Sequence, residues 1–213
     1  RLAKGFIYDR INKEEFYSEE IHMSKIFVDF SKHTAKIKPM HAVNNGPHVS
    51  RGDQTRGNQE LYRAARIPYA RTHDAAFHST YGGEHTVDVH RIFKNFDADE
   101  TNPENYIFEP TDKYIATTLA AGTQIFYRLG ASIEHGYKFG TRVPKDFAKW
   151  ARICEHIVAH YIDGWADGFY YDMPYWEVLN EPDSGHGFRG RIAPMWWGTP
   201  EQYYELYEIT AKP

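Results

Sequence analysis

Cysteine and long apolar runs are the first things this sequence lacks, and each absence excludes a class of protein. Among 213 residues there is one cysteine, Cys154, so an internal disulfide and a zinc site built from several cysteines are both excluded. Cys154 lies on the apolar stripe of a predicted helix, which favours a place in the core. No apolar run reaches the ~20 residues that a membrane-spanning helix needs. The polypeptide as given is predicted to be soluble, and either cytoplasmic or secreted after removal of a leader.

An excess of one charge is lacking as well. The 25 lysines and arginines nearly balance the 29 aspartates and glutamates, for a net charge of −4, and no run of five basic residues occurs. A nucleic-acid partner is therefore not expected. Aromatic residues, by contrast, make up 16% of the chain. Their faces can stack on sugar rings, although a large barrel also packs many aromatic residues in its core.

From residue 36 onward, predicted strands alternate with predicted helices. Strands are expected at residues 36–43, 67–74, 123–130 and 175–183, and helices at 55–66, 111–121, 146–163 and from Thr199 onward. The helix at 146–163 has apolar residues at three- and four-residue spacing, and Thr199 with Gln202 predicts a capping box. Gly122 is expected to cap a helix end. Residues 1–35 are predicted to be a lead-in segment, with Ile26–Phe30 as a strand of an accessory β-element.

Four strand–loop–helix units predict an α/β fold with a parallel sheet. Polar residues follow each strand, so they would share one edge of the sheet, as at the active face of a barrel. A (β/α)8 TIM barrel takes about 250 residues, so residues 36–213 are predicted to be the first four units of one. Open sheet edges would then favour self-association. Pairing with another half and an open α/β domain are the alternatives.

The fourth strand stops abruptly at Asn180-Glu181-Pro182. Proline has no backbone N–H and biases the preceding residue away from the helical conformation, so the strand must end here. Asn180 and Glu181 are therefore expected at the carboxyl end of a strand, where the chemistry of a barrel takes place. An amide can hold a sugar hydroxyl while a carboxyl handles a proton. An ordinary polar turn after a core strand is the alternative.

Three stretches, taken in order, carry a resemblance to a known family. They are Lys-Pro-Met-His-Ala-Val-Asn-Asn-Gly-Pro at 38–47, Tyr-Ala-Arg-Thr-His-Asp at 69–74 and Trp-Glu-Val-Leu-Asn-Glu-Pro-Asp at 176–183. Together they resemble the retaining glycoside hydrolases of clan A. More narrowly, they are similar to glycoside hydrolase family 39, which contains β-xylosidases and α-L-iduronidases. The resemblance covers about residues 26–210.

The resemblance implies roles for three residues. Glu181 matches the general acid/base, Asn180 matches the residue that binds the sugar 2-hydroxyl, and Arg71 matches an arginine beside the nucleophile. A retaining enzyme needs two carboxyl groups about 5–5.5 Å apart, one protonated and one ionised. Apolar neighbours such as Trp176 would raise the pKa of Glu181. A buried arginine would keep the other carboxylate ionised.

The nucleophile is where the sequence departs from the family pattern. In family 39 it is a glutamate on the seventh strand, and this sequence contains four predicted strands. Glu177 shares a strand face with Glu181 but would lie about 13 Å from it, too far for a retaining pair. Glu134, after the third strand, is a weak candidate. The chain as given is therefore expected to be incomplete, and inactive by itself.

Further polar and aromatic residues are candidates for substrate binding. His41 and His73 are predicted partners of sugar hydroxyls. Asp74 either binds hydroxyls or caps a turn. Asn44 either binds sugar or serves the turn that follows it. Trp196 and Trp197 are predicted to form a cleft wall on which a sugar ring stacks, with packing at the rim of the cleft as the alternative.

The histidines raise a metal-dependent barrel as a rival function. His41, His73, His135 and His186 follow predicted strands or lie in the next loops, but no HxH or HExxH pairing occurs. No metal and no cofactor are therefore predicted, and His156 and His160 are expected to be surface or packing residues. The preferred function is a retaining, β-xylosidase-like glycosidase whose partner is a carbohydrate of unspecified linkage. A non-catalytic carbohydrate-binding or assembly module is the other alternative.

Overall fold

The computed structural model describes residues 26–32, 35–36, 38–48, 57–73, 85–131, 141–184 and 194–212. The chain divides into two units, Arg1–Lys38 and Pro39–Pro213. In the first unit, residues 26–29 have no regular secondary structure and residues 30–31 form a turn. The Asp29 carboxylate accepts hydrogen bonds from the backbone N–H and the hydroxyl of Ser31, which bends the chain. The predicted strand at Ile26–Phe30 is therefore wrong.

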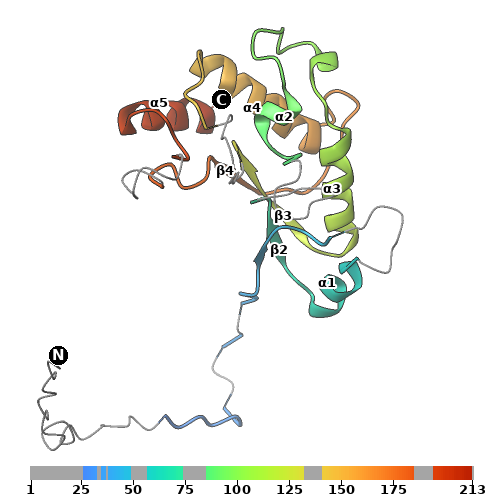
Figure 1. Cartoon of the computed structure of the whole chain (residues 1–213). Coiled ribbons are helices and arrows are strands. Elements are labelled where there is room, and N and C mark those ends of the chain that lie inside the picture. Colours follow the sequence, from blue (N-terminus) through green and yellow to red (C-terminus); the bar gives the residue numbers. More distant parts are fainter. Residues whose placement is uncertain are drawn as a thin grey trace, which may run out of the picture. The chain divides into compact units, whose positions relative to one another are not determined.

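The second unit is built on a parallel sheet with strand order β1-β2-β3-β4 (Figure 1). The strands are β1 Val43–Asn44, β2 Tyr69–Arg71, β3 Gln124–Leu129 and β4 Tyr175–Val178. Each strand pairs in parallel with the next one along the chain. A parallel sheet with helices between its strands confirms the predicted α/β class. Closure into a barrel stays a prediction.

The helices are α1 Gln59–Ala65, α2 Val89–Ile92, α3 Glu109–Ala120, α4 Phe147–Ile162 and α5 Pro200–Ala211, with a 3-10 turn η2 at Pro103–Asn105. Four helices, α1, α3, α4 and α5, lie where the sequence predicts them, with small shifts at their ends, whereas α2 and the 3-10 turn are not predicted. The capping box of α5 is confirmed, since Thr199 Oγ1 accepts from the Gln202 N–H and Gln202 Oε1 accepts from the Thr199 N–H. Gly122 has φ +79° directly after α3, which confirms it as the capping glycine.

The first strand is the largest error in the predicted secondary structure. The sequence predicts residues 36–43, whereas β1 is Val43–Asn44. β1 pairs with β2, which is three residues long, so its ladder can extend no further than that partner allows. Pro39 also lacks the backbone N–H that a ladder requires.

The two faces of the sheet differ in what covers them. One face carries buried side chains that join the core with α3 and α4, among them Ile125, Tyr127 and Leu129. The other face keeps partly exposed aromatic and charged side chains: Tyr69, Arg71, Phe126, Tyr175 and Glu177. Parallel sheets are normally covered on both faces, and in a barrel the strands opposite provide the inner cover. The second face is therefore left partly uncovered by the described residues.

Two expectations from composition can be compared with the structure. Cys154 is buried within α4, which confirms its core position, and burial raises the pKa of its thiol. A buried, protonated thiol of this kind is a poor nucleophile. Within the described ranges, no helix has both the length and the apolar character needed to cross a membrane.

Candidate active site at the carboxyl end of the sheet

Arg71, the last residue of β2, contacts the side chains of Glu177, His73 and Asn180. Its Nε and Nη2 atoms donate to the two carboxylate oxygens of Glu177, at 2.6 and 2.5 Å. Nη2 also donates to Oδ1 of Asn180 at 2.7 Å, and Nη1 lies 2.6 Å from Nδ1 of His73. A guanidinium can only donate, so Nδ1 of His73 accepts and its ring proton is on Nε2. The ends of β2 and β4 are thus joined through one arginine.

The bond between Arg71 and Glu177 passes over the strand between them. In the register, Arg71 pairs with Phe126 of β3, while Glu177 pairs with Arg128 of β3. Neighbouring strands lie about 4.8 Å apart, so β2 and β4 are separated by roughly 10 Å. A long arginine side chain can cross that distance. A bidentate pair of this kind fixes the relative position of three strands.

Breaking this pair is expected to destabilise the fold. Glu177→Gln and Arg71→Met should each lower the free energy of unfolding by about 2 kcal/mol, because the hydrogen bonds are charge-assisted and both side chains are about three-quarters buried (25% and 27% exposed). The double variant should lose clearly less than the sum of the two. Urea unfolding of residues 1–213 measures all three values.

The control is the exposed pair Arg63–Glu60 on α1, whose side chains are 49% and 80% exposed. Glu60→Gln should change the free energy of unfolding by less than about 0.5 kcal/mol. Strictly additive losses for Arg71→Met and Glu177→Gln would show that the two side chains do not interact in solution.

Asn180 is buried, and one of its two side-chain amide atoms has no hydrogen-bond partner among the described residues. Its side chain is 2% exposed, and Oδ1 accepts from Arg71. The atom without a partner in the described part of the chain is the donor Nδ2. Buried donors are almost always paired, so this one calls for an explanation, such as a ligand.

The backbone on either side of Asn180 is strained. Leu179 and Glu181 have φ values of 62° and 40°, in the left-handed region. This conformation costs about 1–2 kcal/mol for a residue other than glycine. Hydrogen bonds from Leu179 N–H to Leu129 O (2.7 Å) and from Ser184 N–H to Glu181 O (2.8 Å) hold the segment in place. Asn180 is thereby buried, while Glu181 stays exposed.

A second ion pair lies next to the site and holds the segment that follows β2. Arg128 of β3 and Asp88, which precedes α2, form a bridge of 2.7 Å with both side chains 0% exposed. Arg128 Nη2 also donates to the His73 carbonyl oxygen at 3.2 Å. The Arg128 backbone N–H donates to Thr72 Oγ1 at 2.8 Å. Together these bonds hold the chain from Thr72 to His73 against the end of β3.

Sequence reasoning missed both of these charge pairs. The spacing along the strand excludes Glu177 as the nucleophile, but the sequence does not predict its pairing with Arg71. The sequence does contain a signal for these pairs. Arg71, Arg128 and Glu177 are each a charged residue among apolar neighbours in a predicted strand. Charged side chains in such positions are almost never buried without partners. Which of them pair depends on the strand register.

The structure brings some of the predicted site residues together and leaves others apart. His73 and Asn180 contact Arg71, and Asn44 lines a hollow of about 440 Å³ with Arg71 and Glu177. His41 precedes β1, and its Nε2 atom lies 2.9 Å from the Arg66 carbonyl at the end of α1. His41 therefore lies toward the amino end of the sheet, away from the other candidates.

One predicted neighbour of Glu181 is corrected. Trp176 points to the helix-covered face, where its ring lies 5.1 Å from Tyr127, so it cannot form an apolar wall beside Glu181. The alternation of side chains along a strand explains this, because Trp176 and Glu177 face opposite sides. Trp197 is 52% exposed and Trp196 lines a hollow, and the stacking of either ring on a sugar stays a prediction.

The remaining candidates include several outside the described ranges, namely Asp74, Glu134, His135 and His186. Among the residues that are described, no three His, Cys, Asp or Glu side chains gather as a metal centre would require. His156 stacks on Trp165 at 4.4 Å, and His160 stacks on Phe108 at 3.6 Å. Their predicted packing role is confirmed.

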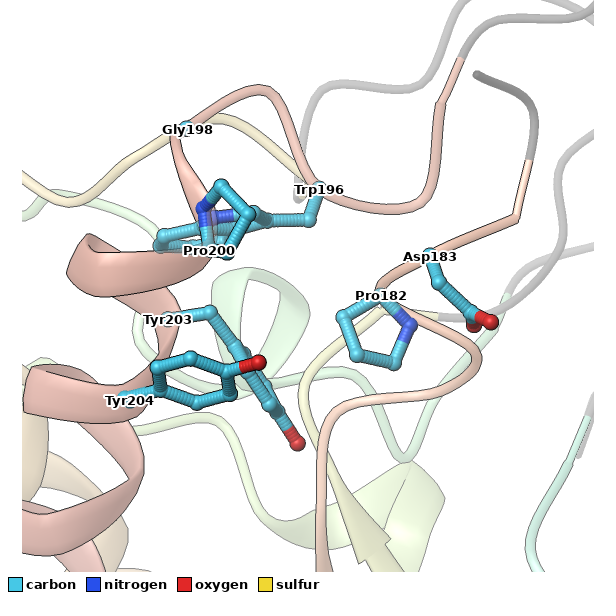
Figure 2. A pocket seen from close by; sticks show the side chains of 7 residues that line it. All are labelled: Pro182, Asp183, Trp196, Gly198, Pro200, Tyr203 and Tyr204. Atoms are coloured by element: carbon cyan, nitrogen blue, oxygen red, sulfur yellow. The ribbon is translucent and has the colours of Figure 1, made fainter. Parts of the chain in front are cut away.

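A second hollow, of about 530 Å³, lies beside the segment that follows Glu181 (Figure 2). Pro182 and Asp183 form one side, and Trp196, Tyr203 and Pro200 stand opposite. Burial raises the pKa of the Tyr203 phenol, so this side chain remains an uncharged donor at neutral pH. Residues of β4 and of the segment after it thus line two hollows, a charged one that includes Arg71 and Glu177 and an aromatic one.

No family model matches the chain. Among solved structures, it is similar to a glucosidase from Croceicoccus marinus, with a TM-score of 0.63 and 25% sequence identity. The match covers 82% of this chain and 34% of the glucosidase, so the chain spans about a third of that enzyme's length. The α/β fold described above is therefore one that this chain shares with part of a glucosidase.

Proposed function

We propose that this chain is the first half of a (β/α)8 retaining glycosidase, of the family 39 type, which acts on β-linked xylosides. The observation that carries the proposal is the contact of Arg71 with Glu177 and Asn180, directly before Glu181 at the carboxyl end of β4. In parallel βα barrels, that end of the sheet holds the active site. The likeness to part of a glucosidase supports the same class of reaction.

In this proposal Glu181 is the general acid/base. It is exposed at a strand end, where a glycosidic oxygen can reach it, and its left-handed backbone is the kind of strain found at functional sites. Asn180 has an unpaired Nδ2 donor for a sugar hydroxyl. His73, whose ring contacts the same arginine, is proposed as a second sugar contact. The two side chains follow β4 and β2.

Glu177 serves as a structural carboxylate and not as the nucleophile. Both of its oxygens accept hydrogen bonds from Arg71, which stabilises the charge and ties β4 to β2. Its spacing from Glu181 along the strand is too long for a retaining pair. The nucleophile is proposed to come from polypeptide outside this chain, on one of the strands that would complete the barrel.

Hydrolysis of 4-nitrophenyl β-D-xylopyranoside tests the proposal. Residues 1–213 alone should release no nitrophenol above background, while a longer protein that contains them and completes the barrel should release it with retention of anomeric configuration. A normal enzymatic rate from residues 1–213 alone would overturn the missing-nucleophile assignment. Sugar binding without turnover by the longer protein would favour a carbohydrate-binding module.

A further inference from the structure

The aromatic hollow beside Glu181 has a rigid inner wall. Trp196 is buried, and its Nε1 atom donates to the Thr199 carbonyl at 2.9 Å, which ties the ring to the start of α5. Its ring lies 6.2 Å from that of Tyr203, nearly edge to face. A Cβ at Gly198 would lie 2.7 Å from Cε2 and Nε1 of Trp196, so glycine is needed for the ring to keep this place. The wall is therefore formed before any ligand enters.

The lining of this hollow suits a flat apolar group. Ring and proline surfaces make up most of it, and its side-chain polar groups are the Asp183 carboxylate and the hydroxyls of Tyr203 and Tyr204. A second sugar would bring several hydroxyls, each of which loses free energy if it is buried without a partner. An aromatic ring needs only apolar surface and ring faces. At about 530 Å³, the hollow has room for such a ring.

The position of the hollow links it to the bond that would be cleaved. Pro182 and Asp183 directly follow Glu181, and they form the side of the hollow that faces Tyr203 and Tyr204 (Figure 2). A group joined to the glycosidic oxygen at Glu181 would therefore lie next to this opening.

We propose that this hollow, formed by Pro182, Trp196, Tyr203 and Tyr204, binds the leaving group of the glycoside and selects aromatic ones. The inference rests on the proposed glycosidase function, in which Arg71, Asn180 and His73 form the sugar site. The hollow adds selectivity for the leaving group. The charged hollow at Arg71 does not supply this selectivity, because it binds the sugar hydroxyls.

Calorimetric titration of residues 1–213 tests the inference with three probes: 4-nitrophenyl β-D-xylopyranoside, methyl β-D-xylopyranoside and free 4-nitrophenol. The nitrophenyl glycoside should bind about three- to tenfold more tightly than the methyl glycoside, owing to ring contacts. Tyr204→Ala should remove most of this preference and leave the methyl glycoside unchanged. Tyr204 is 66% exposed, so the fold does not depend on it.

Tyr207→Ala is the matched control. Tyr207 lies one turn further along α5, is 48% exposed and does not line the hollow, so its loss should leave all three affinities unchanged. Equal binding of the two glycosides, or a nitrophenyl preference that survives Tyr204→Ala, would overturn the inference.

The probes also separate this inference from the glycosidase proposal. Binding of free 4-nitrophenol that weakens in Tyr204→Ala, with no binding of either glycoside, would support an aromatic pocket and count against the glycosidase. Binding of the methyl glycoside that is lost in Asn180→Ala, with no preference for nitrophenyl, would support the glycosidase and overturn the pocket. Failure of all three probes to bind would overturn both.

Discussion

Replacement of Asp88 by alanine is expected to destabilise the chain by about 3–5 kcal/mol, the largest stability effect of any single change considered. Asp88 and Arg128 are both 0% exposed and lie 2.7 Å apart. Without the carboxylate, the guanidinium would stay buried and would lose its charged partner at 2.7 Å. Urea unfolding of residues 1–213 measures the loss.

Two further variants distinguish charge burial from simple loss of packing. Asp88→Asn keeps an oxygen acceptor for Arg128 and should lose less than Asp88→Ala. The double variant Asp88→Ala with Arg128→Met removes the buried charge, and should be more stable than Asp88→Ala alone. If the double variant is instead the least stable of the three, the loss comes from packing and not from an uncompensated charge.

Asp88→Ala should also disturb the candidate site. Arg128 donates to the carbonyl of His73, and His73 in turn accepts from Arg71. Chemical shifts of His73 in the folded variant should therefore change, because Arg128 links the two residues. Exposed ring protons of Tyr207 on α5 serve as the reference that should not move.

Replacement of Glu181 by glutamine should lower kcat by about 10²–10⁴-fold on methyl β-D-xylopyranoside, in a longer protein that contains residues 1–213 and completes the barrel. The amide keeps the shape of the side chain but cannot donate a proton to the leaving oxygen. The loss should be smaller for the 4-nitrophenyl glycoside, because nitrophenolate leaves with little need for protonation. Initial rates with the two substrates measure this difference.

The stability of the Glu181 variants is the control for that experiment. Glu181 is exposed, so Glu181→Gln should change the free energy of unfolding by no more than about 0.5 kcal/mol. Glu181→Gly should be as stable as the wild type or up to about 1 kcal/mol more stable, since glycine relieves the φ of 40°. An equal loss of rate on both glycosides would argue against Glu181 as the proton donor.

Local sequence patterns were sufficient for most of the elements. The apolar spacing from Phe147 to Tyr161 predicts α4, and Thr199 with Gln202 predicts the start of α5, because these signals involve residues within one or two turns of each other. The alternation of strands and helices likewise predicts a parallel sheet with the strands in chain order. The predicted bounds of the first strand are wrong because its length is set by β2 and not by its own residues.

The stretch Asn180-Glu181-Pro182 shows which features a local sequence pattern predicts and which it does not. Pro182 and the apolar residues before it predict a strand that stops at an acid, and the structure ends β4 at Val178, two residues earlier than Asn180. The left-handed bends at Leu179 and Glu181, which bury the amide and expose the acid, have no signature in the sequence. They depend on hydrogen bonds to other parts of the chain.

What the sequence by itself determined is the α/β class, the order of the elements and the place of Asn180 and Glu181 near the end of a strand. Only the tertiary structure decided that Arg71 pairs with Glu177 across β3, that Arg128 pairs with Asp88, and that Trp196 and not Trp197 lines the aromatic hollow. The physical reason is distance along the chain. Arg71 and Glu177 are 106 residues apart, so their contact depends on strand register and not on any local pattern.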